Sequence, residues 1–179
     1  MLKTQEEYGY VVKNGILAFQ RGPLSQWYGG FKSQDSTFTI GSDIEYNCTE
    51  QWMMAMKAKT FKDEETYKLI MSTNDPREQK AAGRRVKNFN QKIWNSKKES
   101  LVFMGNVAKF SKNKELGDFL LATDPWILVE ASPWDDIWGC GTGLDDDRTF
   151  DRKQWQGENL LGKTLEKVRE NLFTQRNGI

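Results

Sequence analysis

The sequence contains no histidine among its 179 residues. This absence excludes Ser-His-Asp and Cys-His nucleophile pairs, HExxH zinc sites and imidazole general bases. If the chain is an enzyme, carboxylates therefore carry out its proton transfers. Zinc held by two cysteines and carboxylates stays open in principle, but Cys48 and Cys140 are far apart in the sequence and neither has a nearby partner. The acidic run 145–147 has the pattern of a solvated turn. We expect neither a metal ion nor a redox cofactor.

Cysteine and long apolar runs are also scarce. Two cysteines imply no disulfide framework. The apolar stretches are far too short to span a bilayer, and residues 1–12 lack the basic start and apolar run of a signal peptide. We therefore expect a cytoplasmic protein with no membrane partner. Lys and Arg number 26 against 25 Asp and Glu. With no global basic excess, any contact with nucleic acid would have to be local.

The length favours one domain over residues 1–179. Its patterning predicts a predominantly helical α+β domain with a small β-hairpin or sheet. Alternating apolar residues predict a hairpin over 36–47. Capping residues and apolar periodicity predict the remaining elements. These are a helix over 50–61 capped by Asn47 or Thr49, helices opened by Asp63 and Asp75, a long helix over 91–111, a helix over 113–122, a buried strand over 126–131 and a closing helix with Leu161, Leu165, Val168 and Leu172 on its core face.

The start of the helix over 50–61 is the first candidate for chemistry. Glu50 and Lys57 are two turns apart on nearly the same face, with roughly 10 Å between their Cα atoms. Trp52 and Met53 supply an apolar surround, which would raise the pKa of the carboxyl group and suit it to proton transfer. The alternative is structural: with Asn47 as the cap, Glu50 would be the acid of a capping box.

The stretch "SPWDDIWGCGTG", residues 132–143, is the second candidate. Trp134 and Trp138 can stack a nucleobase, and Asp135 lies close enough in sequence to reach the same pocket. Gly139 and Gly141 let backbone amides approach ribose or phosphate. The alternative reading makes Trp138 a core residue and the aspartates solvated turn residues.

Two further features have both a functional and a structural interpretation. Asn159 can cap the last helix and turn its amide toward a ligand, or it can be an ordinary cap. Arg84, which follows Gly83, can clamp phosphate bidentately with Trp94 nearby in sequence, or it can be part of a solvated face.

Taken together, these motifs resemble the NADAR family, the YbiA-like N-glycosidases. The resemblance begins at "LSQWY" and continues through "FTIGSDIEYNCTEQWMMAMKAKTF" and "AAGRRV" to Trp94. It ends with "KELGDFLLATDPWILVEASPWDDIWGCG" and "GENLLGKTLEKVRE". It covers residues 24–172, and the motifs are specific as an ordered set.

The resemblance implies a YbiA-like fold and hydrolysis of an N-glycosidic bond between a ribose phosphate and a base. Family members act on early riboflavin-pathway intermediates, and others remove ADP-ribose from modified guanine in nucleic acid. Glu50 stands at the position of the family's catalytic glutamate, and Asp135 is the second carboxylate. The implied substrate-binding residues are Trp27, Lys57, Arg84, Trp94, Trp138, Gly139 and Asn159.

The sequence departs from the family pattern at several places. Gln51 replaces a histidine, Gln26 and Trp27 replace asparagine and phenylalanine, Met54 replaces a glutamine, and residues 144–156 are an insertion. These departures leave the substrate open. It is expected to be a small-molecule ribosyl phosphate or ADP-ribose conjugate, with ADP-ribosylated nucleic acid as a further candidate. The alternative function is a non-catalytic module that binds ADP-ribose or a nucleotide and has no need of Glu50.

Overall fold

The structure, a computed structural model, describes residues 8–30, 36–41 and 43–178. The chain forms two compact units. The sheet unit consists of residues 1–25 and 114–179, and the helical unit consists of residues 26–113. The α+β, mainly helical class is confirmed, while one domain over 1–179 stays a prediction. Within the described ranges, no helix is long and apolar enough to cross a membrane.

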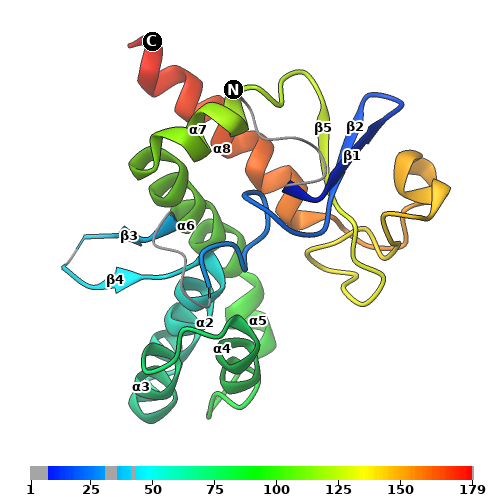
Figure 1. The fold of residues 1–179 in the computed structure, drawn as a ribbon. Coiled ribbons are helices and arrows are strands. Elements are labelled where there is room, and N and C mark those ends of the chain that lie inside the picture. Colours follow the sequence, from blue (N-terminus) through cyan, green and yellow to red (C-terminus); the bar gives the residue numbers. More distant parts are fainter. Residues whose placement is uncertain (1–7, 31–35, 42, 179) are drawn as a thin grey trace. The chain divides into compact units, whose positions relative to one another are not determined.

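The sheet unit is built on three strands (Figure 1). β1 (Tyr10–Lys13) and β2 (Ile16–Phe19) form an antiparallel hairpin, and β5 (Ile127–Glu130) pairs with β2 in parallel. The turn residues Asn14 and Gly15 both have positive φ, 53° and 74°. This backbone conformation suits the tightest hairpin turns, which match the twist of the strands. The predicted strand over 126–131 is confirmed as β5; the hairpin before it was not predicted.

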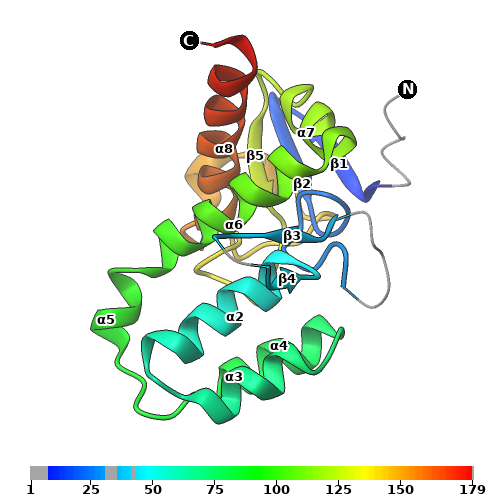
Figure 2. The same cartoon turned by 90° about the vertical axis from the view of Figure 1, so that its left-hand side faces the viewer.

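Two helices complete the sheet unit. α7 (Lys114–Leu121) and α8 (Leu160–Asn177) pack against each other, and α8 lies along β5 (Figure 2). Glu166 of α8 accepts a hydrogen bond from the backbone N–H of Leu128 at 2.9 Å. The outer edge of β5 is therefore covered by side chains of α8, which prevents it from pairing with another strand. The predicted core face of the closing helix is confirmed, since all four of its residues are buried.

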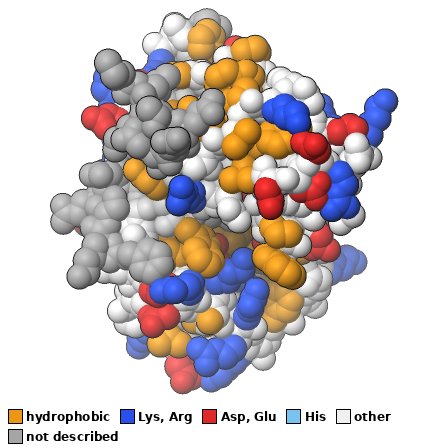
Figure 3. All heavy atoms as spheres, turned by 45° about the vertical axis from the view of Figure 1, so that its right-hand side comes forward, with side chains coloured by type: hydrophobic (Ala, Val, Ile, Leu, Met, Phe, Trp, Pro, Cys, Tyr) orange, Lys and Arg blue, Asp and Glu red, His pale blue; other side chains and the backbone are white. Residues whose placement is uncertain are grey.

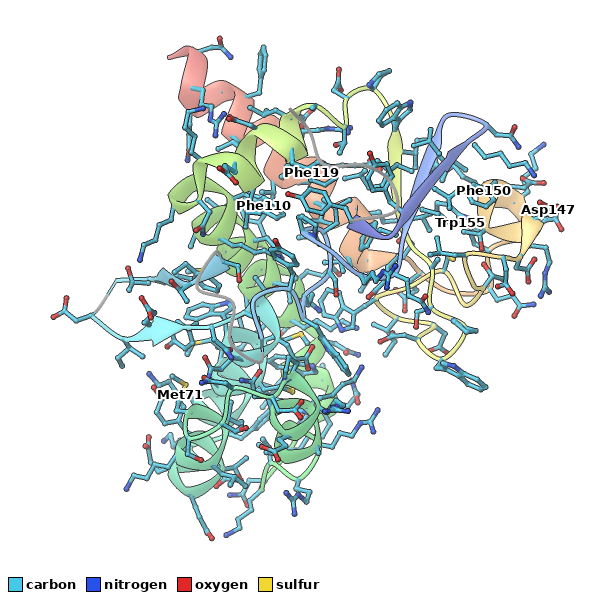
Figure 4. The ribbon with its side chains drawn as sticks, viewed as in Figure 1. Met71, Phe110, Phe119, Asp147, Phe150 and Trp155 are labelled. Carbon is cyan, nitrogen blue, oxygen red and sulfur yellow. The ribbon has the colours of Figure 1, made fainter. Side chains whose placement is uncertain are left out.

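The insertion over 144–156 forms two short 3-10 helices, η2 (Asp147–Phe150) and η3 (Arg152–Gln154). Phe150 belongs to a buried cluster with Ile16, Ala18 and Val129, so it packs on one face of the sheet. Trp155 lies against the same cluster and donates from Nε1 to the carbonyl of Thr149 at 2.9 Å (Figure 4). The extra length is thus a part of the core of this unit.

The helical unit is organised around one central helix. α2 (Thr49–Thr60) packs against three other helices (Figure 2). Asp63 and Asp75 cap two of these as predicted, accepting backbone N–H bonds from Thr66 at 3.1 Å and Arg77 at 2.8 Å. The predicted hairpin is confirmed in a shorter form, and its turn residue 42 lies outside the described residues. The other elements are β3 (Phe38–Thr39), β4 (Glu45–Tyr46), α3 (Glu64–Met71), α4 (Pro76–Gly83), α5 (Gln91–Asn95) and α6 (Lys98–Lys112).

The prediction of one long helix over 91–111 was wrong, because the chain breaks between α5 and α6. Asn90 caps α5 by accepting from the N–H of Ile93 at 3.0 Å. Ser96 ends α5, and its hydroxyl donates back to the carbonyl of Ile93 at 2.8 Å. Such local side-chain bonds compete with a continuous helix, and apolar periodicity does not reveal them.

Two glycines allow helices to approach α2 closely. A Cβ atom on Gly83 of α4 would lie 2.0 Å from Sδ of Met54. A Cβ atom on Gly105 of α6 would lie 2.5 Å from Cδ1 of Trp52. The Trp52 indole also donates to the carbonyl of Leu101 at 2.7 Å, so it is fixed in this position.

We predict that Gly105→Ala lowers the free energy of unfolding by about 1–3 kcal/mol, because the added methyl group overpacks against a fixed indole ring. This reverses the usual gain of about 1 kcal/mol for Gly→Ala inside a helix. Chemical denaturation measures the change. Met104→Ala, at an exposed position of the same helix, is the control and should shift stability by about 0.5 kcal/mol or less. An increase in stability for Gly105→Ala would contradict the close packing.

Candidate active site

The first turn of α2 determines what Glu50 can do. The N-cap residue is Cys48, not Asn47 or Thr49 as predicted, and its side chain makes no capping bond. Glu50 is therefore the second helical residue and Gln51 the third. Gln51 accepts the backbone N–H of Asn47, the residue before the N-cap, through Oε1 at 2.8 Å. This resembles the back-reaching contact of a capping box, displaced by one residue. The capping-box interpretation of Glu50 is thus wrong.

Gln51 is fully engaged in structural bonds. Besides accepting from Asn47, its Nε2 donates to the carbonyls of Ile70 at 3.3 Å and Thr73 at 3.2 Å. These bonds connect the start of α2 to the end of α3. Gln51, which stands where the family pattern has a histidine, therefore links the start of α2 to the end of α3.

Glu50 is 2% exposed, and its carboxylate is held in place from the loop before β3. The indole Nε1 of Trp27 donates to Oε2 of Glu50 at 3.3 Å. The backbone N–H of Glu50 donates to the carbonyl of Gln26 at 3.0 Å, and the hydroxyl of Thr49 donates to the same carbonyl at 3.2 Å. A negative charge in the first turn is also favoured by the helix dipole. Burial and these contacts hold the carboxylate in one position.

Lys57 lies two turns along α2, among aromatic rings. Its ammonium is 4.4 Å from the ring centre of Phe89 and 5.8 Å from that of Trp94. Burial lowers the pKa of Lys57, and the positive charge of Arg84 lowers it further, while the charge of Glu50 acts in the opposite direction. Lys57 therefore interacts electrostatically with both the carboxylate and the guanidinium.

Five of the predicted site residues are connected in the helical unit, and we call them the Glu50 group. Trp27 donates a hydrogen bond to Glu50, and Lys57 interacts electrostatically with both Glu50 and Arg84. The ammonium of Lys57 also contacts the ring of Trp94. The close packing of Gly83 on α2 brings the end of α4 toward Lys57. Sequence reasoning missed Phe89, although an aromatic residue between two basic runs was a usable signal. The Glu50 group comprises Trp27, Glu50, Lys57, Arg84 and Trp94.

The other four predicted site residues lie in the sheet unit. Asp135 accepts the backbone N–H groups of Ile137 at 3.1 Å and Trp138 at 2.8 Å through Oδ1. This fixes the loop and favours a structural role for that oxygen. Trp138 is 9% exposed, which agrees with its interpretation as a core residue. Trp134, on the same loop, is 94% exposed and has an open ring face.

Gly139 and Asn159 hold this loop against the sheet. A Cβ atom on Gly139 would lie 2.9 Å from the carbonyl of Asp135, and the Gly139 carbonyl accepts the N–H of Asn159 at 3.0 Å. Asn159 precedes α8 in a left-handed conformation without a side-chain cap. Its Oδ1 accepts from the N–H of Glu130 at 3.0 Å, and its Nδ2 donates to the carbonyl of Leu128 at 2.9 Å. Asn159 is thus the N-cap residue of α8 as predicted, but its side chain makes no capping bond, because both polar atoms bind the edge of β5. Its role in substrate binding stays a prediction.

The cysteines and acids offer no alternative chemistry in the described part of the chain. There, no three Cys, Asp or Glu side chains gather in a way that could hold a metal ion. Asp146 is paired with Arg148 at 2.6 Å, and Asp147 with Lys13 at 2.7 Å. Cys48 is buried, which raises the pKa of its thiol to about 12, so it is not a thiolate nucleophile at neutral pH.

The profile of the NADAR domain matches residues 17–173. The chain belongs to the NADAR family. A member named N-glycosidase R617, from Acanthamoeba polyphaga mimivirus, is 41% identical over 90% of this chain and 95% of its own length. N-glycosidase YbiA of Escherichia coli is 32% identical over 93% of this chain and 94% of its own. The NMR structure of the E. coli protein YbiA matches this NADAR chain with a TM-score of 0.73 at 25% identity, covering 98% of this chain and 95% of that one.

A buried lysine lies in the core behind the start of α2 in this NADAR chain. Lys109 of α6 is fully buried, with its ammonium 5.6 Å from the ring centre of Tyr28 and 5.1 Å from that of Phe110. Burial lowers the pKa of Lys109 to about 7. Below that pH the folded protein holds a charged ammonium in its core; above it, the side chain is neutral.

We predict that the free energy of unfolding rises with pH above about 7 because of Lys109. The unfolded chain keeps the proton up to the ordinary pKa of 10.5, so between these values it binds more protons than the folded state. The slope is at most about 1.4 kcal/mol per pH unit. Lys109→Met should remove this part of the slope. Urea unfolding of both proteins over this pH range tests it, and identical slopes would refute it.

Proposed function

We propose that this chain is a hydrolase that cleaves the N-glycosidic bond between a ribose phosphate, or ADP-ribose, and a nucleobase or aminopyrimidine. One observation carries the proposal. Glu50 is a buried, positioned carboxylate that is released from helix capping by Gln51 and lies within electrostatic reach of Lys57. Membership of a family with several members named N-glycosidase supports the same reaction.

The chemistry requires a negative group beside the anomeric carbon. As the C1′–N bond lengthens, positive charge develops on the ribose ring, and the carboxylate of Glu50 stabilises it. The base leaves with the bonding electron pair, water adds its oxygen to C1′, and the proton that this water loses passes to the carboxylate and from there to the base, which regenerates the carboxylate. The Trp27 indole keeps Glu50 aimed, and the cationic groups of Lys57 and Arg84 bind the phosphate. No step needs a metal ion or a cofactor.

Gln26 supports a bound ligand next to Glu50. Its side chain is 5% exposed, and Oε1 is buried with no hydrogen-bond partner among the described residues. A buried acceptor without a partner is costly, typically by about 1–3 kcal/mol. A ribose hydroxyl or a base N–H would satisfy it. We therefore assign Gln26 as an acceptor for the substrate.

Within the sheet unit, we propose that the loop over 132–143 is a surface that can bind a base. Trp134 is the ring that a base can stack on, since it is exposed and its loop is fixed by Asp135. Stacking on such a ring is worth about 1–3 kcal/mol. We propose that Asp135 acts by holding this loop, with Trp138 packed beneath it.

We predict that Glu50→Gln lowers turnover about a hundredfold or more, equivalent to about 2.7 kcal/mol of barrier. Stability should change by at most about 1 kcal/mol, because Gln51 carries the capping contact. Chromatographic detection of base release from ribosylaminopyrimidine phosphates and ADP-ribosylated guanine, with thermal melting, measures both. Glu64→Gln, an exposed acid in the first turn of α3, is the matched control and should keep full turnover. Near-normal turnover by Glu50→Gln would contradict this mechanism. If the wild type binds ADP-ribose or a nucleotide but releases no base, the non-catalytic binding module is favoured instead.

We predict that Asp135→Asn retains turnover within a few-fold, because the amide oxygen can still accept the N–H groups of Ile137 and Trp138. Asp135→Ala should lose about tenfold or more in kcat/KM, as each lost backbone bond is worth about 1 kcal/mol. Asp136→Asn, an exposed neighbour, controls for the loss of negative charge nearby. If Asp135→Asn were as inactive as Asp135→Ala, the carboxylate charge itself would be needed, and Asp135 would be a second catalytic acid.

A further inference from the structure

The charges of the chain are distributed unevenly between its two units. The helical unit has fifteen Lys and Arg residues against ten Asp and Glu, a net charge of +5. The sheet unit has eleven against fifteen, a net charge of −4. Residues 79–98 of the helical unit contain seven basic residues and no acidic one. The overall charge of +1 therefore conceals a basic helical unit that can attract an acidic partner.

A hollow of about 550 Å³ between α3 and α4 collects three of the cationic side chains. Lys68 belongs to α3, whereas Arg85 and Lys87 follow the end of α4. One acid lines the hollow, Glu65, and it is paired with Lys87 at 2.7 Å. Neither Lys68 nor Arg85 forms an ion pair or a side-chain hydrogen bond with any residue that the structure describes. Two positive charges of the hollow are therefore left for a ligand.

The two walls of the hollow are held together by Asp63. Its Oδ1 accepts the backbone N–H of Thr66 in α3 at 3.1 Å, and its Oδ2 accepts the backbone N–H of Lys87 at 2.8 Å. These bonds hold the pKa of Asp63 below its usual range. Because both oxygens are engaged and the residue is 5% exposed, its charge does not occupy the hollow. The hollow is thus formed before any ligand arrives, which lowers the cost of binding.

The hollow also presents apolar surface. Leu69, next to Lys68 on α3, is 50% exposed, and Ala82 of α4 lies buried on the other side. Figure 3 shows Lys and Arg side chains over the lower part of the view, where the helices of this unit lie, with hydrophobic side chains between them. An apolar centre with charged groups around it is the usual anatomy of a protein–protein contact.

The exposure of the lining favours a polypeptide segment over a small molecule. The side chain of Lys87 is 65% exposed and that of Glu65 is 83% exposed. Small-molecule sites enclose about 70–90% of their ligand's surface, which walls as exposed as these do not provide. A polypeptide segment can lie across the hollow, cover Leu69 with an apolar side chain and keep its acids at the rim.

We propose that this hollow is a docking site for an acidic segment of a partner protein. An apolar side chain of the segment packs on Leu69, and carboxylates on either side of it pair with Lys68 and Arg85. This interaction goes beyond the proposed hydrolysis and does not depend on it. Exposed charge pairs are screened by salt, so binding is expected to weaken as the ionic strength rises.

The first measurement uses a fluorescein-labelled peptide, "GDELDEG", which has an acidic pair on each side of one leucine. Its neutral counterpart "GNQLNQG" has the same shape and the same apolar side chain. Fluorescence anisotropy at about 50 and 200 mM salt measures both. The wild-type protein should bind the acidic peptide at least about tenfold more tightly than the neutral one, and the difference should shrink at the higher salt concentration.

The second measurement compares a double variant, Lys68→Gln with Arg85→Gln, with the wild type. It should bind the acidic peptide about tenfold more weakly, because two charge pairs are lost. Leu69→Ala keeps both charges and should weaken binding about threefold through its lost apolar surface. The matched control is Lys92→Gln with Lys112→Gln, which removes two exposed lysines elsewhere in the same unit and should stay within about twofold of the wild type.

Four results would overturn the inference. Equal affinity for the two peptides would show that the acids are not recognised. Equal losses in the double variant and its control would show attraction by net charge alone. Displacement of the peptide by an equal concentration of inorganic pyrophosphate would make the hollow a phosphate site. Self-association at low salt that the double variant abolishes, seen by sedimentation velocity, would make a second copy of this chain the occupant.

Discussion

The hydrogen bond from the backbone of Asn47 to the side chain of Gln51 is the interaction on which the site depends. A helix start must satisfy its first N–H groups, and an acid near that position usually does so. The side chain of Cys48 makes no capping bond, and it is Gln51, not Glu50, that reaches back to the residues before the helix. The same glutamine fixes the end of α3. One side chain thus stabilises the start of the helix, and the carboxylate of Glu50 is not engaged in this contact.

Close packing around α2 brings the other members of the site together. Gly83 allows the end of α4 to approach α2, which puts the guanidinium of Arg84 within electrostatic reach of Lys57. Gly105 allows α6 to approach on the indole of Trp52. A larger side chain at either glycine would push a helix away. The electrostatics of the carboxylate and its cations are therefore a consequence of helix packing as well as of residue type.

The sequence predicts well whatever is decided locally. The caps at Asp63 and Asp75, the strand β5 and the core face of α8 follow from short patterns and are confirmed. The hairpin turn at Asn14 and Gly15 could also have been predicted, because Asn-Gly between apolar runs is the strongest short-range hairpin signal. It was not among the predicted elements. The break at Ser96 was harder to predict, since it depends on side-chain bonds that compete with apolar periodicity.

Part of the site could not be predicted from the sequence. The side chain of Asn159 pairs with β5, which lies about thirty residues earlier, and no local pattern reveals such a contact. Trp134 and Trp138 are also indistinguishable by sequence pattern, because each lies beside an acidic residue or a glycine in the same loop. In the folded protein Trp138 is buried and Trp134 is exposed. In contrast, Glu50 and Lys57 lie on one helix, so their spacing alone placed them on nearly the same face.

The most direct test of the central claim is a crystal structure of the Glu50→Gln protein with an uncleaved ribosyl substrate bound. If Glu50 stabilises the developing charge, the anomeric carbon lies within about 3.5 Å of the substituted side chain, as a reactive geometry requires. The phosphate should contact Lys57 or Arg84 in the same complex. A substrate whose anomeric carbon lies beside another carboxylate, far from position 50, would contradict the account.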